Sequence, residues 1–303
     1  MIQLSETLQP LINLMKDEVV GYDMAYIDAT SLQVLHEPGR HPETKSHAYC
    51  IRGGPPEKAV SLYEYNGHYK PHIYTHRDFV ADTLAGFEGV LHCDAAPMFN
   101  GVAEQSAVTL SYCHAHARRK FEEIEKTRTK GKKKGKPGLA TYVLRNVYRP
   151  LYAIEKTMTQ QGLTPTDKQT YRDTHSRPIL ESWHAWLIEH EPMTLPHSPI
   201  GKAIRYALQH WEGLAVFLSD GGVEIDNNAT ERDIKPFVMG RKNFLSACTQ
   251  AGADSLGVHF SLIVTAKHHG LNPAAYYEAL FNRLPLCRSI QDYAALLPWA
   301  ISL

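Results

Sequence analysis

Three acidic side chains, far apart in the sequence, each lie where a regular element should end or begin. Asp28 and Asp94 each come at the end of a short apolar run that predicts a strand. Glu231 follows Asp226 and Asn227, whose side chains suit the free N–H groups at the start of a helix. In the first turns of that helix, an ionised carboxylate is stabilised by the positive end of the helix dipole.

Three carboxylates that folding brings together would repel one another unless hard divalent cations lay between them. A pair of Mg²⁺ or Mn²⁺ ions in that position could activate an attacking oxygen and stabilise the leaving oxygen of a phosphodiester. We therefore predict Asp28, Asp94 and Glu231 as catalytic residues and as ligands of two metal ions. For Glu231 alone, a surface acid paired with Lys235 is the competing interpretation.

Basic side chains flank these acids along the chain. We expect the following residues to contact a nucleic-acid backbone: His114, Arg118, Arg119, Lys120, Arg232, Lys235, Arg241 and Lys242. Cations for the phosphates, together with acids that hold metal at the scissile bond, suit the cleavage of a polynucleotide. Two alternatives stay open: the run from Arg118 to Lys120 also fits an exposed helix face, and His114 could simply be packed.

Composition limits the partners and the compartment. Lys and Arg together number 32, as do Asp and Glu, so a surface for nucleic acid must be local. The five cysteines show neither a disulfide framework nor the paired spacing of a zinc site, which fits a reducing cytosol. No apolar run approaches the roughly 18 residues of a membrane span, and the start does not resemble a signal peptide. We expect a soluble, intracellular protein.

The elements that must position the acids follow a definite order. An amphipathic helix over 5–18 precedes strand-like runs at 24–28, continued over 31–36, at 47–51 and at 60–65. A helix over 77–87, a strand over 89–94, and a strand over 108–112 that leads into a long charged helix come next. This order predicts an α/β fold, a ribonuclease H-like mixed five-stranded sheet with flanking helices. In that topology the strand ending at Asp94 lies beside the strand that carries Asp28.

Residues 122–220 interrupt this core with helical periodicity, which predicts an all-helical insertion. The predicted segments are an N-terminal helix (1–21), the first part of the core (22–121), the insertion (122–220), the last part of the core (221–284) and a C-terminal tail (285–303). Within the insertion, the lysine-rich segment 130–138 fits a disordered tether or a phosphate-binding arm. Further helices are predicted at 251–269 and from 272 onwards, with a stop at Gly270 between them.

Several segments also resemble a known family. These are Cys113–Phe121, Asp226–Arg232, Gly240–Asn243, Ser261–Lys267 and Gly270–Pro273. In this order they resemble the transposases of the insertion-sequence sixty-six family, from about Tyr22 to the C-terminal tail. The resemblance implies a DDE enzyme whose acids are Asp28, Asp94 and Glu231. It also implies metal-dependent DNA cleavage at transposon ends and joining of the 3′-hydroxyl to target DNA.

The chain departs from the family at Ala29, where relatives have Glu, and at Ala247-Cys248, where they have Gly-Ser. The resemblance covers the catalytic region, and from it we expect this chain to lack the N-terminal coiled coil, zinc segment and DNA-recognition region of longer relatives. It implies double-stranded DNA as partner, a homo-oligomer on that DNA, no membrane, and a place in the bacterial cytosol at the nucleoid. Two other functions stay open: a silent remnant that only binds DNA or a transposase, and a ribonuclease H-like nuclease without strand transfer.

Overall fold

The structure is a computed structural model that describes residues 1–67, 76–105, 107–129 and 138–303. The chain forms two compact units. The first contains Met1–Leu91, Ala96–Thr109 and Asn228–Leu303, and the second contains His92–Ala95 and Leu110–Asn227. The five segments predicted from the sequence stay a prediction, and most of the lysine-rich segment, residues 130–137, lies outside the described residues.

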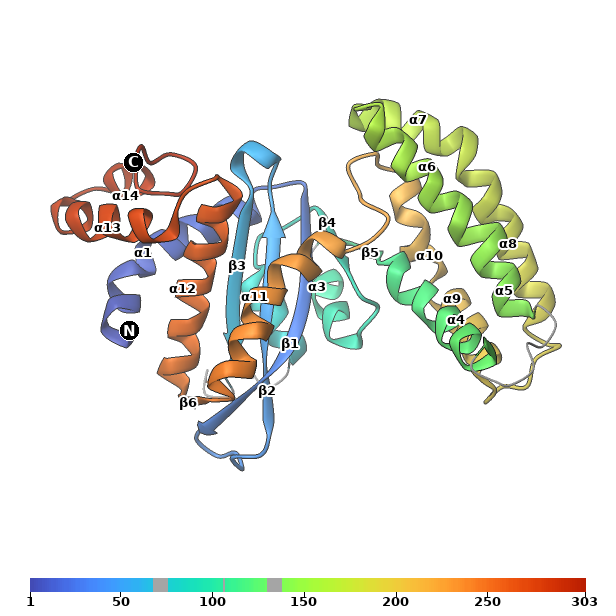
Figure 1. Ribbon diagram of the computed structural model, residues 1–303, viewed down its shortest axis with the longest axis horizontal. Helices are drawn as coiled ribbons and strands as arrows, with labels where there is room; N and C mark the ends of the chain where they lie inside the picture. Colours follow the sequence, from blue (N-terminus) through green and yellow to red (C-terminus); the bar gives the residue numbers. More distant parts are fainter. Residues whose placement is uncertain (68–75, 106, 130–137) are drawn as a thin grey trace. The chain divides into compact units, whose positions relative to one another are not determined.

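The predicted ribonuclease H-like mixed sheet is confirmed, with five strands in the order β3-β2-β1-β4-β5 (Figure 1). Its strands are β1 (Met24–His36), β2 (Lys45–Gly53), β3 (Val60–Asn66), β4 (Val90–Cys93) and β5 (Thr109–Tyr112). Strands β1, β2 and β3 form the expected antiparallel meander, with Asp28 opposite Cys50. The N–H of Val90 at the start of β4 donates to the carbonyl of Asp23 at 2.8 Å.

The prediction that Asp28 ends its strand is wrong. Strand β1 continues to His36 because β2 pairs with it continuously, from Ala25 opposite Gly53 to Gln33 opposite Lys45. A short strand, β6 (Ala247–Thr249), pairs in parallel with the far end of β1. The sequence analysis missed β6, since three residues are too few for an alternating pattern.

Helices α11 (Asn228–Phe244) and α12 (Gln250–His268) cover one face of the sheet (Figure 1). Helix α11 packs on β1 and β2, and α12 packs on β3. The core between them is made of buried side chains from both helices and the sheet: Leu32, Val34, Ala48, Cys50, Tyr63, Tyr65, Ile234, Phe237, Ala247, Ala253 and Val264. This apolar layer fixes α11, and with it the region of Glu231, against the sheet.

Helix α12 also closes the outer edge of β3. The Oγ of Ser261 accepts a hydrogen bond from the N–H of Tyr63 at 2.8 Å, and Thr265 Oγ1 accepts from the N–H of Ser61 at 3.0 Å. At Gly257, one turn earlier, an added Cβ would lie 2.5 Å from the carbonyl oxygen of Tyr63. This helix face, built from small and hydroxyl-bearing residues, therefore satisfies an edge that would otherwise offer unpaired N–H groups.

The first unit also contains further α-helices. They are α1 (Ile2–Val20), α2 (His76–Thr83), α3 (Asn100–Gln105), α13 (Pro273–Arg283) and α14 (Ile290–Ala294). Helix α1 packs against α12, and Phe79 of α2 lies against Tyr49 of β2, with ring centroids 5.2 Å apart. Asn272 caps α13 as predicted, accepting from the N–H of Ala274 at 2.9 Å. Across the described ranges, every helix is too short or too polar to span a lipid bilayer.

The second unit is mainly helical. Its helices are α4 (His114–Thr129), α5 (Leu139–Val143), α6 (Arg149–Gln160), α7 (Pro165–His175), α8 (Arg177–His190), α9 (Pro199–Gln209) and α10 (Trp211–Ala215). A π-helical turn, Leu144–Tyr148, joins α5 to α6. Trp183 lies at the centre of an aromatic core, with its ring 5.4 Å from that of Tyr148 and 6.4 Å from that of Phe121.

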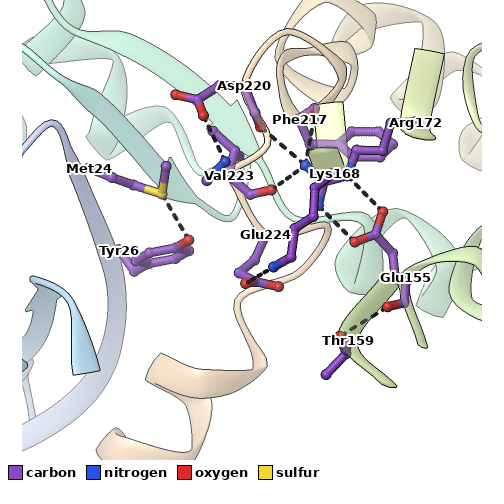
Figure 2. Close-up of polar contacts among 11 residues, drawn as sticks. Met24, Tyr26, Glu155, Thr159, Lys168, Arg172, Phe217, Asp220, Val223 and Glu224 are labelled. Carbon is purple, nitrogen blue, oxygen red and sulfur yellow. Dashed lines mark hydrogen bonds and ion pairs between the residues drawn. The ribbon is translucent and has the colours of Figure 1, made fainter. Parts of the chain in front are cut away.

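A buried arginine fixes the segment that leads out of these helices (Figure 2). Arg172 of α7 is 0% exposed and donates to both carboxylate oxygens of Glu155 on α6, at 2.9 and 2.7 Å. Its Nη1 donates to the carbonyls of Phe217, Asp220 and Val223 at 2.8–3.1 Å. One charged group thereby ties two helices to the chain that approaches Asp226.

Candidate active site

Asp28 lies on the sheet face that α11 covers. Alternate residues of a strand face the same side, and Leu32 and Val34 of β1 belong to the core beneath α11 and α12. Asp28 shares their parity, and its cross-strand partner Cys50 belongs to the same core. The Asp28 carboxylate is partly exposed, and its Oδ1 accepts from the N–H of Ala29 at 2.8 Å.

Helix α11 begins at Asn228 and carries Glu231 in its first turn, as predicted. Ile234 and Phe237 of the same helix are buried in the core, whereas Glu231 is partly exposed. The apolar positions therefore set the rotation of α11 about its axis. They leave Glu231 accessible near the positive end of the helix dipole.

Asp233, two residues after Glu231, forms a buried polar cluster that the sequence analysis missed. Its Oδ2 accepts from Ser61 Oγ at 2.7 Å and lies 3.0 Å from His268 Nε2 and 3.5 Å from Arg52 Nε. These partners come from β3, α12 and β2, so one carboxylate ties α11 to three other elements. Only its spacing of one turn from Phe237, on the buried side of α11, could have indicated its burial.

The pKa of the Cys50 thiol depends on the charges on this face. Burial raises the pKa of the Cys50 thiol well above its ordinary value, and the nearby carboxylates of Asp233 and Asp28 raise it further. The thiol is therefore protonated and inert in the folded protein. The same interaction indicates that the two carboxylates lie near one core residue, within the first unit.

Asp94 follows β4 and belongs to the second unit. Its neighbour there is Tyr206 of α9, which the sequence analysis also missed. Burial, followed by the negative charge of Asp94, raises the pKa of Tyr206 to about 12, and the backbone of Ala95 donates to the phenol oxygen. The Nζ of Lys120 on α4 lies 4.1 Å from the centroid of the Tyr206 ring. The phenol of Tyr206 thus lies near the second acid, and a lysine lies over the ring of this tyrosine.

The segment before α11 is held on the start of α4 within the second unit. The N–H of Asn227 donates to Cys113 Sγ at 3.2 Å, and the N–H of His114 donates to the carbonyl of Ile225 at 3.0 Å. Tyr152 of α6 lies beside Asp226, whose charge, after burial, raises the pKa of this tyrosine. The resemblance to the family rested partly on both of these segments, Cys113–Phe121 and Asp226–Arg232, which are in contact.

His114 is completely buried, with Nε2 2.8 Å from the carbonyl oxygen of Leu214 and its ring against Phe217. Burial lowers the pKa of His114 to about 4, so the ring is neutral near pH 7. A neutral imidazole within the core cannot contact a phosphate in solution. The placement fits the packing alternative, and we leave His114 out of the proposed DNA contacts.

The other basic residues differ in their surroundings. Arg118 pairs with Glu122 at 2.8 Å and lies over the ring of Tyr152. Arg241 is engaged with β1, because its Nη1 donates to Thr30 Oγ1 at 2.8 Å. The side chains of four further residues are exposed: Arg119, Arg232, Lys235 and Lys242. Exposed cations suit phosphate contacts, whereas Arg241 has a structural role in this structure.

Carboxylate oxygens are the donors that Mg²⁺ and Mn²⁺ prefer, and Asp28, Asp94 and Glu231 are all partly exposed, so the predicted donor set fits such ions by its chemistry. Within 1–67, 76–105, 107–129 and 138–303, no group of three or more His, Cys, Asp or Glu side chains is close enough to hold a metal ion. Asp28 and Glu231 belong to the first unit and Asp94 to the second. Convergence of the three acids stays a prediction.

Comparison with known proteins gives two family matches. The family described as Transposase IS66 family matches residues 1–255, and the IS66 C-terminal element matches residues 261–299. Together they extend over both units described above.

Three proteins of Sinorhizobium fredii are similar to this chain, and each is described as uncharacterized. The protein y4hP is 34% identical over 228 residues, which are 71% of this chain and 40% of that protein. The protein y4jD is 33% identical over 223 residues, 71% of this chain and 42% of that protein. The protein y4qI is 29% identical over 308 residues, 96% of this chain and 53% of that protein.

This chain therefore spans about half the length of these curated relatives, or less. The family match, running from residue 1 to residue 255, extends over most of the chain and includes all three predicted acids. On this basis the chain belongs to the IS66 family of DDE transposases.

Proposed function

We propose that this chain is the catalytic region of a transposase, which cleaves DNA strands at transposon ends and joins the 3′-hydroxyl to target DNA. One observation carries the proposal. Helix α11 places Glu231 in its first turn, on a helix packed against the sheet face that bears Asp28, in a chain of the IS66 family. Asp94 follows the strand next to β1 in the sheet order.

In this proposal Asp28, Asp94 and Glu231 hold two Mg²⁺ or Mn²⁺ ions. Bound there, the ions would activate the attacking oxygen and neutralise charge on the scissile phosphate. The protein's own contribution is to fix the acids. The apolar core beneath α11 and the Asp233 cluster hold Glu231 in place, and Tyr206 lies near enough to Asp94 for the charge of Asp94 to raise its pKa.

The exposed cations supply the proposed contacts to double-stranded DNA. Arg119, Arg232, Lys235 and Lys242 are exposed, and Lys120 Nζ lies over the ring of Tyr206. Such contacts position a duplex without reading its sequence. We further propose that two or more copies act together, because joining both transposon ends to a target requires two active sites.

The test is metal-dependent nicking of supercoiled DNA by the wild-type protein and by Asp94→Asn. The substitution removes a metal-binding charge from a partly exposed side chain, so it should abolish nicking while the melting temperature stays unchanged. Asp173→Asn, a similar change at an exposed ion pair on α7, is the control and should nick normally. Equal nicking by wild type and Asp94→Asn would refute the assignment of the catalytic acids.

The same material separates the two other functions. A precut donor end incubated with target DNA should yield joined product if the protein is a transposase. Hydrolysis without joined product would instead identify a ribonuclease H-like nuclease. Salt-sensitive DNA binding without any nicking would identify a catalytically silent remnant.

A further inference from the structure

Helices α4 and α9 pack side by side in the second unit (Figure 1). Side chains of both helices line a groove. Its volume is about 660 Å³, within the range of sites that hold a small molecule or a few atoms of a polymer. The residues that line it are Lys120, Glu123, Ile124, Thr127, Arg128, His197, Pro199, Lys202 and Ala203. On α4 these residues recur every three or four positions, so they form one face of the helix.

The lining is cationic. Lys120, Arg128 and Lys202 face a single carboxylate, Glu123, among the residues that line the groove. Arg128 is already paired with Glu125, its Nε donating at 3.0 Å. Lys120 and Lys202, in contrast, have no carboxylate partner within the described part of the chain. Two unneutralised ammonium groups on one small groove favour an anionic ligand.

The groove is also partly apolar, since Ile124, Pro199 and Ala203 contribute to its wall. Cations beside an apolar surface match the two parts of a nucleotide, its phosphate and its sugar and base. Inorganic phosphate alone would leave the apolar part of the groove without a partner. The composition therefore favours a strand of nucleic acid over a free anion.

Two residues, Lys120 and Tyr206, connect the groove with the second acid. Lys120 lines the groove, and its Nζ lies 4.1 Å from the centroid of the Tyr206 ring. Tyr206 in turn accepts from the backbone of Ala95 and lies near the charge of Asp94. All of these residues belong to the second unit. A strand lying in the groove would thus approach Asp94 past Lys120 and Tyr206.

We propose that the groove between α4 and α9 binds a single DNA strand, with phosphates on Lys120 and Lys202 and a sugar or base against Ile124 and Ala203. The strand bound there is one whose scissile phosphate, or freed end, is presented to Asp94. This inference rests on the proposed function, because it takes DNA as the substrate.

The experiment measures the affinity of the whole chain for a short labelled DNA, single-stranded and duplex, in EDTA so that no cleavage occurs. Lys202→Glu should weaken single-strand binding about tenfold at ~0.1 M salt and reduce the slope of log K against log salt by about 1. Glu123→Gln should strengthen binding, because it removes the acid from the groove. Lys202 and Glu123 are exposed, so both variants should keep the wild-type melting temperature.

Lys156→Glu is the matched control, with the same charge change at an exposed lysine of α6 outside the groove. If Lys202→Glu binds the single strand as tightly as Lys156→Glu does, or if only duplex binding falls, the groove does not hold a single strand. Nicking by the wild-type protein in that case leaves the transposase function intact. A wild-type protein that neither binds nor nicks DNA would overturn both proposals.

Discussion

Arg241, near the end of α11, donates a hydrogen bond of 2.8 Å to Thr30 Oγ1, and Thr30 lies two residues after Asp28 in β1. The same nitrogen donates to the carbonyl and the hydroxyl of Ser31. The helix that carries Glu231 in its first turn is therefore fastened near its other end to the strand that carries Asp28. A residue chosen from the sequence as a DNA contact instead holds together two elements that bear proposed catalytic acids.

Replacing Arg241 should separate positioning from DNA attraction. Arg241→Lys keeps the charge but loses the planar donor group, so we expect nicking to fall at least tenfold while DNA affinity stays near wild type. The free energy of unfolding should fall by about 1–2 kcal/mol. Lys242→Met, at the exposed neighbour, should instead weaken DNA binding without loss of stability. A fall in affinity for Arg241→Lys that matched its loss of nicking would assign the residue to the DNA.

Replacing Asp233 should lower the free energy of unfolding strongly, although its neighbour in the sequence, Arg232, is exposed. Asp233 is 7% exposed, and its removal in Asp233→Ala leaves Ser61, His268 and Arg52 without their shared acceptor. We expect a loss of about 2–4 kcal/mol in urea unfolding, because buried donors lose their partner. Arg232→Ala, one residue earlier and exposed, should change stability by less than about 0.5 kcal/mol. Similar losses for the two variants would contradict the role of the cluster.

Arg172 should contribute strongly to the stability of the second, mainly helical unit. Arg172→Met keeps much of the volume but leaves the Glu155 carboxylate and three backbone carbonyls without their donor (Figure 2). Removing one partner of a buried ion pair costs about 3–5 kcal/mol, so the variant should unfold at markedly lower urea concentration. Arg177→Met, whose ion pair with Asp173 is exposed, is the control and should cost less than about 1 kcal/mol.

Acid should destabilise the protein through its buried histidines. Burial lowers the pKa of His114 to about 4, from about 6.5 in the unfolded chain. Protonation of His114 is less favourable in the folded protein than in the unfolded chain. The resulting contribution of His114 to the free energy of unfolding is therefore fully present above pH 6.5. It is lost as the pH falls from 6.5 towards 4, by about 3 kcal/mol in total. His92, whose pKa burial lowers to about 3, adds a loss of the same sign.

The measurement is the free energy of unfolding at several pH values between 7 and 4. His114→Gln removes the titrating ring, so its stability should be lower at pH 7 and should decline less steeply on acidification than that of the wild type. His197→Gln, at an exposed position, should keep the wild-type pH dependence. An unchanged pH dependence in His114→Gln would show that this histidine does not oppose protonation of the folded state.

Local patterns in the sequence were sufficient to predict that Asp28 lies on a strand and Glu231 near the start of a helix. Consecutive capping residues before Glu231 placed the start of α11, since helix starts are set by residues that satisfy their own free N–H groups. Alternation and turn residues placed the β1–β3 meander, and the order of elements gave the five-stranded sheet. These signals are local, because each depends on neighbours within a few residues.

The tertiary structure decided which partners individual side chains have and how far they are buried. Nothing in the local pattern shows that Arg241 reaches Thr30, that Asp233 meets Ser61, or that the charge of Asp94 acts on Tyr206, because each partner lies more than 100 positions away in the sequence. His114 is buried for the same reason, since its partners on α10 and beyond are distant in the chain. The sequence by itself determined that Glu231 lies in the first turn of a helix and that Asp28 lies on a strand, because capping and alternation are local signals. Strand pairing decided that β1 continues past Asp28, and packing between distant segments decided which charges are held in the core and which face solvent.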